Sequence, residues 1–285
     1  MTKTGASTGR PRVVVDPHGR RLSEIFSPGD LARLHDIAEV VWGQDEPMPV
    51  DAARDAMSDA VAIVTAGWRY GPIPASASKL RAIIDVSGGL PASLDYADCF
   101  ARGIHALTAA PGFARQVAEM ALGMALASCR SIVAGDRAMR AGQEKWMHAG
   151  NEDTFMLFDQ PVGFIGFGGI ARALQPLLAP FHCPISAFDP WLGDGYLRSQ
   201  GVTPVSLEHL VESSRVVFVL AAPTPSNQAL LDRAVLERFQ PGAVLVLVSR
   251  AHVVDFDAMT ELVGQGRLRA VPGVWNTLNR VPVLT

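Results

Sequence analysis

The sequence contains few cysteines and no cluster of them. The three, Cys99, Cys129 and Cys183, lie far apart, and no two show the C-x-x-C spacing of zinc or redox sites. This scarcity argues against a secreted fold held together by disulfides and against a cysteine-based metal centre. We therefore expect no bound metal, and three buried or half-buried thiols in a reducing compartment.

Long apolar runs and an excess of charge are also absent. No stretch reaches the roughly 18 apolar residues of a membrane span, and the first dozen residues, MTKTGASTGRPR, lack the apolar centre of a signal peptide. Charged residues make up only 19% of the chain and the net charge is -3, which gives no reason to expect nucleic acid or an anionic membrane as a partner. We expect a cytoplasmic protein that binds small molecules or other protein chains.

Hydrophobic residues, in contrast, make up 48% of the 285 residues. The chain can therefore bury substantial cores, and it is long enough for about two domains. In its first part, short apolar runs alternate with amphipathic segments, of which 28–37 could be a helix capped by Ser27. Such alternation predicts a parallel sheet with helices on both faces. The runs expected to be strands are 13–16, 39–42, 61–66, 80–86 and 104–108.

The second part begins with the stretch 112–142, whose apolar residues recur at helical spacing, so we expect one long helix or two in tandem. The expected strands that follow are 162–167, 184–188, 216–221, 243–248 and 268–274, and the expected helices are 169–180, 206–213, 228–239 and 255–264. The chain is thus predicted to be an α/β protein with two doubly wound parallel-sheet domains, 1–110 and 111–285. Ligands of such sheets bind at the carboxyl ends of the strands.

The segment 166–171, GFGGIA, has the G-x-G-x-x-A form of a dinucleotide-binding turn. Gly166 would permit the tight turn, Gly168 would let backbone N–H groups approach a pyrophosphate, and the following helix would direct its positive end at that anion. Asp189, at the end of the next strand, could accept both hydroxyls of an adenosine ribose and would repel a 2′-phosphate. No cation follows it in Pro190-Trp191-Leu192, so NAD is favoured over NADP. A purely structural glycine turn is the alternative.

Arg250 follows the predicted strand 243–248, at the expected mouth of the nucleotide crevice. A guanidinium there can bind a carboxylate through two parallel N–H bonds and can polarise a neighbouring carbonyl. The alternative is a surface ion pair with Asp255 or Asp257.

Several blocks in order along the chain resemble the D-isomer-specific 2-hydroxyacid dehydrogenases. They are VGFIGFGGIARAL at 162–174, APTPSN at 222–227, FQPGAVLVLVSRAHVVDFDAM at 239–259, GRLRA at 266–270, and SGGLPASLDYADCFARGIHALTAAP at 87–111. The resemblance implies a flavodoxin-like substrate domain followed by a Rossmann-type NAD-binding domain. The implied reaction is hydride transfer between NAD and a substrate, which interconverts a D-2-hydroxy acid and a 2-keto acid. A homodimer that pairs through the helix over 112–142 is implied as well.

Carried over position by position, the resemblance assigns the cofactor to the glycine turn and to the ends of later strands. It implies that Arg250 is the catalytic arginine that orients the carboxylate and the carbonyl of the substrate. The residues implied to surround NAD are Gly166, Gly168, Gly169, Ile170, Asp189, Ala221, Ala222, Asn227, Ser249, Arg250 and Gly273.

Two loops of the first domain are implied to contact the substrate. Ser87, Gly88 and Gly89 match the loop whose backbone N–H groups receive the substrate carboxylate, although a plain glycine turn after a strand has the same pattern. Trp68 and Arg69 occupy a second loop that could set specificity, although such residues are also common on exposed loops.

The C-terminal part departs from the family pattern. Gly273 stands where the family carries Asp, Leu278 stands where its catalytic Glu is expected, and its catalytic His would lie beyond Thr285. None of the seven histidines is a convincing replacement. These departures suggest a truncation or a change of reading frame after Asn276, and they predict NAD binding with poor catalysis. They also leave open a second function, a non-catalytic NAD-binding sensor or scaffold of the same fold.

Overall fold

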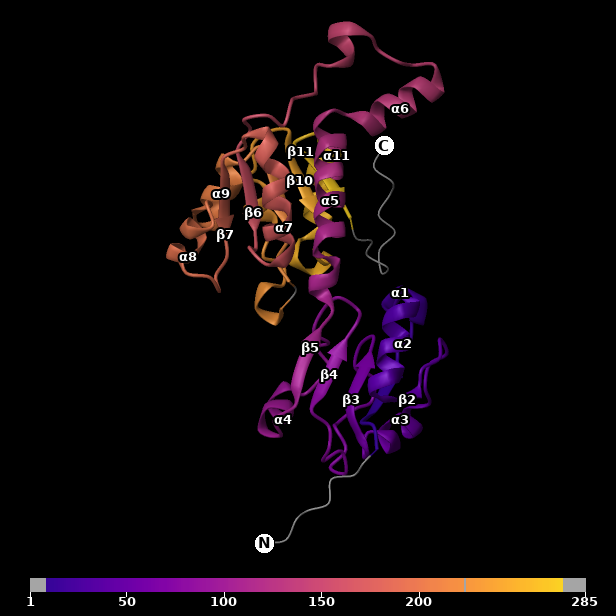
Figure 1. Ribbon diagram of the computed structural model, residues 1–285. Helices are drawn as coiled ribbons and strands as arrows, with labels where there is room; N and C mark the ends of the chain where they lie inside the picture. Colours follow the sequence, from indigo (N-terminus) through magenta and orange to yellow (C-terminus); the bar gives the residue numbers. More distant parts are fainter. Residues whose placement is uncertain (1–8, 223, 274–285) are drawn as a thin grey trace. The chain divides into compact units, whose positions relative to one another are not determined.

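The computed structural model describes residues 9–222 and 224–273. The chain divides into two compact units, Met1–Phe113 and Ala114–Thr285. In Figure 1 the first runs from indigo to magenta and the second from magenta to yellow. The division falls in the first turn of helix α5 (Ala110–Cys129), close to the expected boundary at residue 110.

The first unit contains a five-stranded parallel sheet in the order β2-β1-β3-β4-β5. This is the flavodoxin-like order, in which the winding reverses between β1 and β3. Both faces are buried, because Val14 and Ile63 pack in one cluster and Val15 and Val64 in another. The strands are β1 (Arg12–Asp16), β2 (Glu39–Trp42), β3 (Ala60–Thr65), β4 (Ala82–Asp85) and β5 (His105–Thr108), and the helices are α1 (Leu22–Ile25), α2 (Pro28–Ile37), α3 (Val50–Ala56) and α4 (Tyr96–Ala101).

Helix α2 has the bounds that its sequence predicts. The side-chain oxygen of Ser27 accepts a hydrogen bond from the Asp30 N–H at 3.1 Å, and Pro28 occupies the first turn. The predicted cap is therefore confirmed.

The second unit contains a six-stranded parallel sheet in the order β11-β10-β9-β6-β7-β8, in which the winding reverses between β6 and β9. This is the Rossmann order, so the predicted pair of flavodoxin-like and Rossmann-type domains is confirmed. The strands are β6 (Val162–Ile165), β7 (Ile185–Phe188), β8 (Thr203–Pro204), β9 (Val216–Val219), β10 (Ala243–Leu247) and β11 (Leu268–Pro272). The α-helices after β6 are α7 (Gly169–Leu178), α8 (Asp194–Ser199), α9 (Leu207–Ser213), α10 (Arg233–Leu236) and α11 (Phe256–Gly264), and short 3-10 turns include η2 (Ala179–Phe181), η3 (Pro225–Asn227) and η4 (Ala251–Val253).

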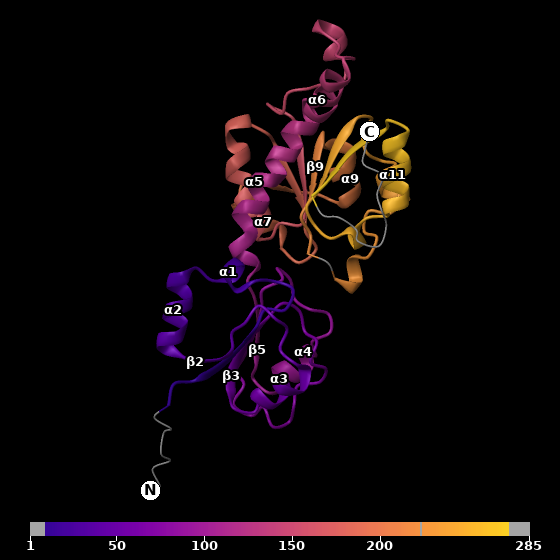
Figure 2. The same ribbon diagram turned by 90° about the vertical axis from the view of Figure 1, so that its right-hand side faces the viewer.

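Helices cover this sheet on both faces. Figure 2 shows α5 and α7 on one side of it and α9 and α11 on the other. Helix α5 packs on the sheet through small side chains, namely Ala114, Ala118, Ala121, Ala125 and Cys129. The other face is filled by larger residues such as Leu210, Leu245 and Leu262.

The stretch 112–142 forms two helices, which was one of the two expected arrangements. Helix α5 ends at Cys129, and α6 (Ile132–Ala141) begins after Ser131, whose φ is 50°. No single helix in the described ranges is long and apolar enough to cross a membrane; α5 and α6 together meet that length and composition, with a bend of 57° between them.

The prediction of a helix over 228–239 is wrong for the first half of that range. Only α10 forms, and Asp232 caps it by accepting a hydrogen bond from the Val235 N–H. The residues before it bond elsewhere, because the Ala229 N–H donates to the His252 carbonyl and the Leu231 N–H to the Val253 carbonyl. A tertiary pairing therefore replaces the local helical bonds.

Candidate functional site

Gly166 and Gly168, in the turn between β6 and α7, differ in how strictly the fold requires glycine. Gly166 has a φ of 91°, and a Cβ at this position would lie 2.7 Å from the Ala221 Cα. Backbone strain and close packing therefore both require glycine there. At Gly168, a Cβ would meet no atom within 4 Å. Gly168 thus leaves open space in front of helix α7, where the fingerprint predicts that a pyrophosphate binds.

The N-terminus of α7 presents free hydrogen-bond donors to that space. The first helical bond is donated by the Arg172 N–H to the Gly168 carbonyl at 3.1 Å. Within the described part of the chain, the N–H groups of Gly169, Ile170 and Ala171 donate to no protein atom. Free N–H groups and the positive end of a helix together bind phosphate groups.

Asp189 follows β7 and is tied to the glycine turn. Its Oδ2 accepts a hydrogen bond from the Phe167 N–H at 2.8 Å, and its Oδ1 accepts one from the Trp191 N–H at 2.9 Å. A carboxylate oxygen can accept more than one hydrogen bond, so both oxygens can still accept ribose hydroxyls. Asp189 is therefore bonded directly to the glycine turn.

One cation that contacts the glycine turn was not predicted from the sequence. Arg172, on the first turn of α7, donates to the Gly168 carbonyl at 3.3 Å and to the Tyr196 hydroxyl, on helix α8, at 3.4 Å. Its position after the fingerprint gives no signal, because the contact depends on the packing of α8 beside α7.

The ends of β9 and β10 are linked by hydrogen bonds. Ser249 Oγ donates to the Ala221 carbonyl, and Asn227 Nδ2 donates to the Ala222 carbonyl at 2.8 Å. His252 is exposed in η4, and its Nε2 lies 3.2 Å from Asn227 Oδ1. Because that oxygen is an acceptor, the histidine nitrogen donates. The structure thus gathers these predicted cofactor residues at one edge of the sheet.

Arg250 is exposed directly after β10, before η4. Among the described residues its guanidinium has no hydrogen-bond or ion-pair partner. Neither alternative ion pair, with Asp255 or with Asp257, is formed, and the Asp255 side chain instead caps α11 by accepting from the Ala258 N–H at 3.0 Å. Arg250 is therefore free to bind an anion.

Gly273 lies at the end of β11, against helix α5. A Cβ here would lie 3.0 Å from Met120 Cε, 3.2 Å from Val248 Cγ1 and 3.3 Å from Met124 Cε. The ends of the Met120 and Met124 side chains occupy the space that a larger residue would need. An Asp, which the family carries at this position, would therefore not fit here without a shift of these side chains. Leu278 lies outside the described residues.

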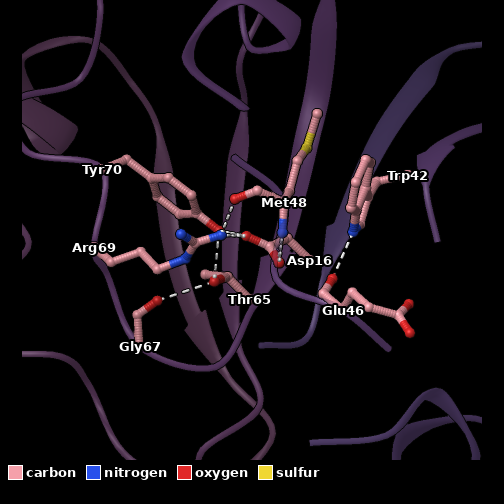
Figure 3. Close-up of polar contacts among 8 residues, drawn as sticks. All are labelled: Asp16, Trp42, Glu46, Met48, Thr65, Gly67, Arg69 and Tyr70. Atoms are coloured by element: carbon pink, nitrogen blue, oxygen red, sulfur yellow. Dashed lines mark hydrogen bonds and ion pairs between the residues drawn. The ribbon is translucent and has the colours of Figure 1, made fainter. Parts of the chain in front are cut away.

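In the first unit, the strands β1, β3 and β4 end in buried polar side chains, Asp16, Thr65 and Asp85. Figure 3 shows the cluster around Asp16. Its carboxylate accepts hydrogen bonds from the Met48 N–H at 3.0 Å, from Arg69 Nη2 at 2.5 Å and from the Tyr70 hydroxyl. Burial, and then the bond to Asp16, raise the pKa of Tyr70 far above its usual value.

The loop with Trp68 and Arg69 is part of the core of the first unit rather than a freely exposed loop. Trp68 is 5% exposed, and its indole N–H donates to the Gly71 carbonyl at 2.7 Å. Arg69 directs its guanidinium at Asp16 and at the Met48 carbonyl. The hydrogen-bonding groups expected to contact a substrate are therefore largely engaged inside the unit.

Ser87 also departs from the expectation that its N–H receives the substrate. Asp85 Oδ1 accepts the Ser87 N–H at 2.7 Å and also the Ser87 hydroxyl. The N–H groups of Gly88 and Gly89 have no acceptor within the described ranges. Of the three predicted amides, these two are the ones left free for a ligand.

No group of three or more His, Cys, Asp or Glu in the described residues is arranged to hold a metal. The cysteines are free thiols, buried at Cys99 and Cys129 and half-buried at Cys183, as predicted. Burial raises the pKa of Cys129 to about 11.

Comparison with known proteins agrees with this geometry. A family model described as "D-isomer specific 2-hydroxyacid dehydrogenase, NAD binding domain" matches residues 122–276. The D-3-phosphoglycerate dehydrogenase of Mycobacterium tuberculosis (strain ATCC 25618 / H37Rv) is 28% identical over 251 residues, which make up 87% of this chain and 46% of that protein. The chain thus spans about half the length of this curated relative.

Solved structures show the same likeness. A phosphoglycerate oxidoreductase from Rhizobium etli is 34% identical, with a TM-score of 0.76 over 96% of this chain and 83% of the other. The NADPH-dependent glyoxylate/hydroxypyruvate reductase of Sinorhizobium meliloti shares the fold at 23% identity, with a TM-score of 0.70 over 97% of this chain and 83% of its own. The matched NAD-binding domain, together with these relatives, shows that the chain belongs to the D-isomer specific 2-hydroxyacid dehydrogenase family.

Proposed function

We propose that this chain is an NAD-dependent oxidoreductase that interconverts a D-2-hydroxy acid and a 2-keto acid by hydride transfer. One observation carries the proposal: the open space at Gly168 is bordered by the free N–H groups of α7 and joined to Asp189 through the Phe167 N–H. These groups match a dinucleotide in charge and in hydrogen-bonding character. The family to which the chain belongs supplies the reaction class.

The residues fit NAD in a defined way. The N–H groups of Gly169 and Ile170 would bind the pyrophosphate, and Asp189 would accept the ribose hydroxyls. The Asp189 carboxylate would repel a 2′-phosphate, so NAD is preferred. Arg172 is the cation that a 2′-phosphate would require, because it lies against α8, the helix that follows Asp189.

When bound, the nicotinamide would supply or accept the hydride. Arg250 would bind the substrate carboxylate and polarise the keto oxygen, where negative charge develops during reduction. The Arg250 guanidinium has no partner among the described residues, so its donors are available for that role. The proton that completes the new hydroxyl group would come from solvent water. In the first unit, the N–H groups of Gly88 and Gly89, which have no acceptor among the described residues, would be donors for a substrate carboxylate.

The test is to follow NADH absorbance with glyoxylate, hydroxypyruvate and bulkier 2-keto acids, in the wild type and in Arg250→Ala. We expect the substitution to lower kcat/KM by about 10² to 10³, the usual effect of removing a donor to a developing oxyanion. Arg267→Ala is the control, because Arg267 is an exposed arginine of the same unit. Equal turnover of Arg250→Ala and the wild type would remove Arg250 from the mechanism.

A second candidate is a non-catalytic NAD sensor or scaffold. It is favoured by the histidine nearest to Arg250 in the sequence, since His252 is bonded to Asn227 rather than free to carry a proton to substrate. This candidate predicts NADH binding without turnover of any 2-keto acid, and a partner protein whose affinity changes with NADH.

We further propose a homodimer that pairs through the helices after the domain division. Helix α6 and the turn η1 (Met147–Gly150) project from the body of the second unit in both views (Figures 1 and 2). This arm exposes large apolar side chains, namely Ile132, Val133, Met139, Trp146 and Met147. An exposed apolar surface of this kind is typical of a protein interface.

A further inference from the structure

The Asp85 carboxylate joins two loops of the first unit. Asp85 ends β4 and is 1% exposed. Its Oδ2 accepts the N–H of Gly67, in the loop after β3, at 2.6 Å, while its Oδ1 accepts the N–H of Ser87, in the loop after β4, at 2.7 Å. The Ser87 hydroxyl adds a third donor.

Both loops need such an anchor. Gly67 has a φ of 89° and Gly88 a φ of 91°, so each loop bends through a conformation that glycine adopts without holding it rigidly. A further bond links the loops, because Ser93 Oγ donates to the Trp68 carbonyl at 2.6 Å. Thr65 Oγ1 donates to the Gly67 carbonyl at 3.0 Å, so the first loop is held at both peptide groups of its glycine.

We propose that Asp85 is a positioning residue: its carboxylate fixes the turn at Ser87 so that the N–H groups of Gly88 and Gly89 are directed at a substrate carboxylate. This inference rests on the proposed dehydrogenase function. Asp85 does not touch the substrate. It acts by engaging the Ser87 N–H and by connecting this turn to the loop at Gly67.

The chemistry of the site requires a carboxylate and not merely a residue of this shape. Backbone N–H groups approach both oxygens, so each oxygen must be an acceptor. An asparagine has the same size but only one acceptor atom, so its NH₂ group would face either the Gly67 or the Ser87 N–H. Two donors would then oppose each other in a buried site, which is unfavourable, and one loop would move.

Asp59→Asn is the matched control for Asp85→Asn. Asp59 directly precedes β3, at the opposite end of the same sheet, and pairs with Lys79 at 2.6 Å on the surface. Both substitutions remove one carboxylate from the same unit without changing its size. Of the two aspartates, only Asp85 is hydrogen-bonded to the loops that contain Gly67 and Ser87.

The experiment is steady-state kinetics with glyoxylate and NADH, at a temperature well below the melting point of each variant. We expect Asp85→Asn to raise KM for glyoxylate at least tenfold, to change kcat less than threefold and to leave KM for NADH within twofold. Asp59→Asn should change none of these. A general loss of structure would instead lower kcat and the affinities for both ligands together.

If Asp85→Asn does not fold, Ser87→Ala tests the same contact, because it removes the hydroxyl bond and keeps the N–H. We expect KM for glyoxylate to rise about threefold with kcat unchanged, since one hydrogen bond to a charged group is lost. An active wild type whose KM is the same in Asp85→Asn, or in Ser87→Ala where only that variant folds, would overturn the role of Asp85 alone. A wild type that reduces no 2-keto acid, whether or not it binds NADH, would overturn the proposed function, and this role with it.

Discussion

The Asp189 carboxylate accepts a hydrogen bond from the backbone N–H of Phe167 at 2.8 Å. Phe167 lies between the two glycines of the turn after β6, and Asp189 follows β7, the neighbouring strand. The bond connects the proposed ribose acceptor to the turn proposed to bind the pyrophosphate, so a change at one should affect the other.

We predict that Asp189→Asn weakens NADH binding about tenfold, because a charged acceptor of the ribose hydroxyls becomes neutral and the new NH₂ group would face either the Phe167 or the Trp191 N–H. The ratio of NADPH to NADH affinity should rise, since the repulsion of a 2′-phosphate is removed. Adding Arg172→Ala should lower NADPH affinity again. Calorimetry with both nucleotides measures these effects, and Asp194→Asn, in an exposed pair with Arg198, is the control. Unchanged NADH affinity in Asp189→Asn would contradict the assignment.

The two glycines of the turn should respond differently to alanine. Gly166→Ala should destabilise the second unit by about 2 to 4 kcal/mol, because its φ of 91° and the close Ala221 backbone oppose a side chain. Gly168→Ala should leave stability within about 0.5 kcal/mol but weaken NADH binding, because its Cβ would enter the open space in front of α7. Urea unfolding and nucleotide calorimetry on both variants separate these results. Equal loss of stability in the two variants would show that Gly168 is structural as well.

Stability should fall at alkaline pH because of Cys129. Burial raises the pKa of this thiol to about 11, so the folded state keeps the proton over a range in which the unfolded chain, with a thiol pKa of about 8.5 to 9, loses it. The free energy of unfolding that the protonated Cys129 thiol contributes is fully present below about pH 9 and is lost as the pH rises through about 11. We expect the wild type to lose roughly 2 to 3 kcal/mol more than Cys129→Ala over this range. Parallel pH curves for the two proteins in urea unfolding would contradict this expectation.

The proposed homodimer predicts that a charge on the arm separates the protomers. Val133, on α6, is 56% exposed. Val133→Asp should give a monomer in sedimentation velocity while the wild type sediments as a dimer, because an unpaired charge in an apolar interface is unfavourable. Ile37→Asp, at an apolar residue of the first unit that is 69% exposed, should stay dimeric. A monomeric wild type would exclude the dimer.

Much of the fold and of the cofactor site follows from local patterns along the chain. The buried strands, the Ser27 cap and the glycine turn are predicted correctly, because hydrophobic period and turn chemistry are properties of adjacent residues. The placement of Asp189 is also local, since an acid that directly follows a strand must lie at the strand's carboxyl end.

The order of the strands, and every contact that depends on it, is decided by tertiary structure. Two hydrogen bonds, from the Gly67 N–H to Asp85 and between His252 and Asn227, join segments far apart in the sequence. The burial of Trp68 likewise depends on how distant segments pack. The same long-range pairing removes the first half of the helix expected over 228–239. Local propensity therefore predicts which segments become strands and turns, whereas only the packing of neighbouring strand ends determines which N–H groups stay free for a ligand.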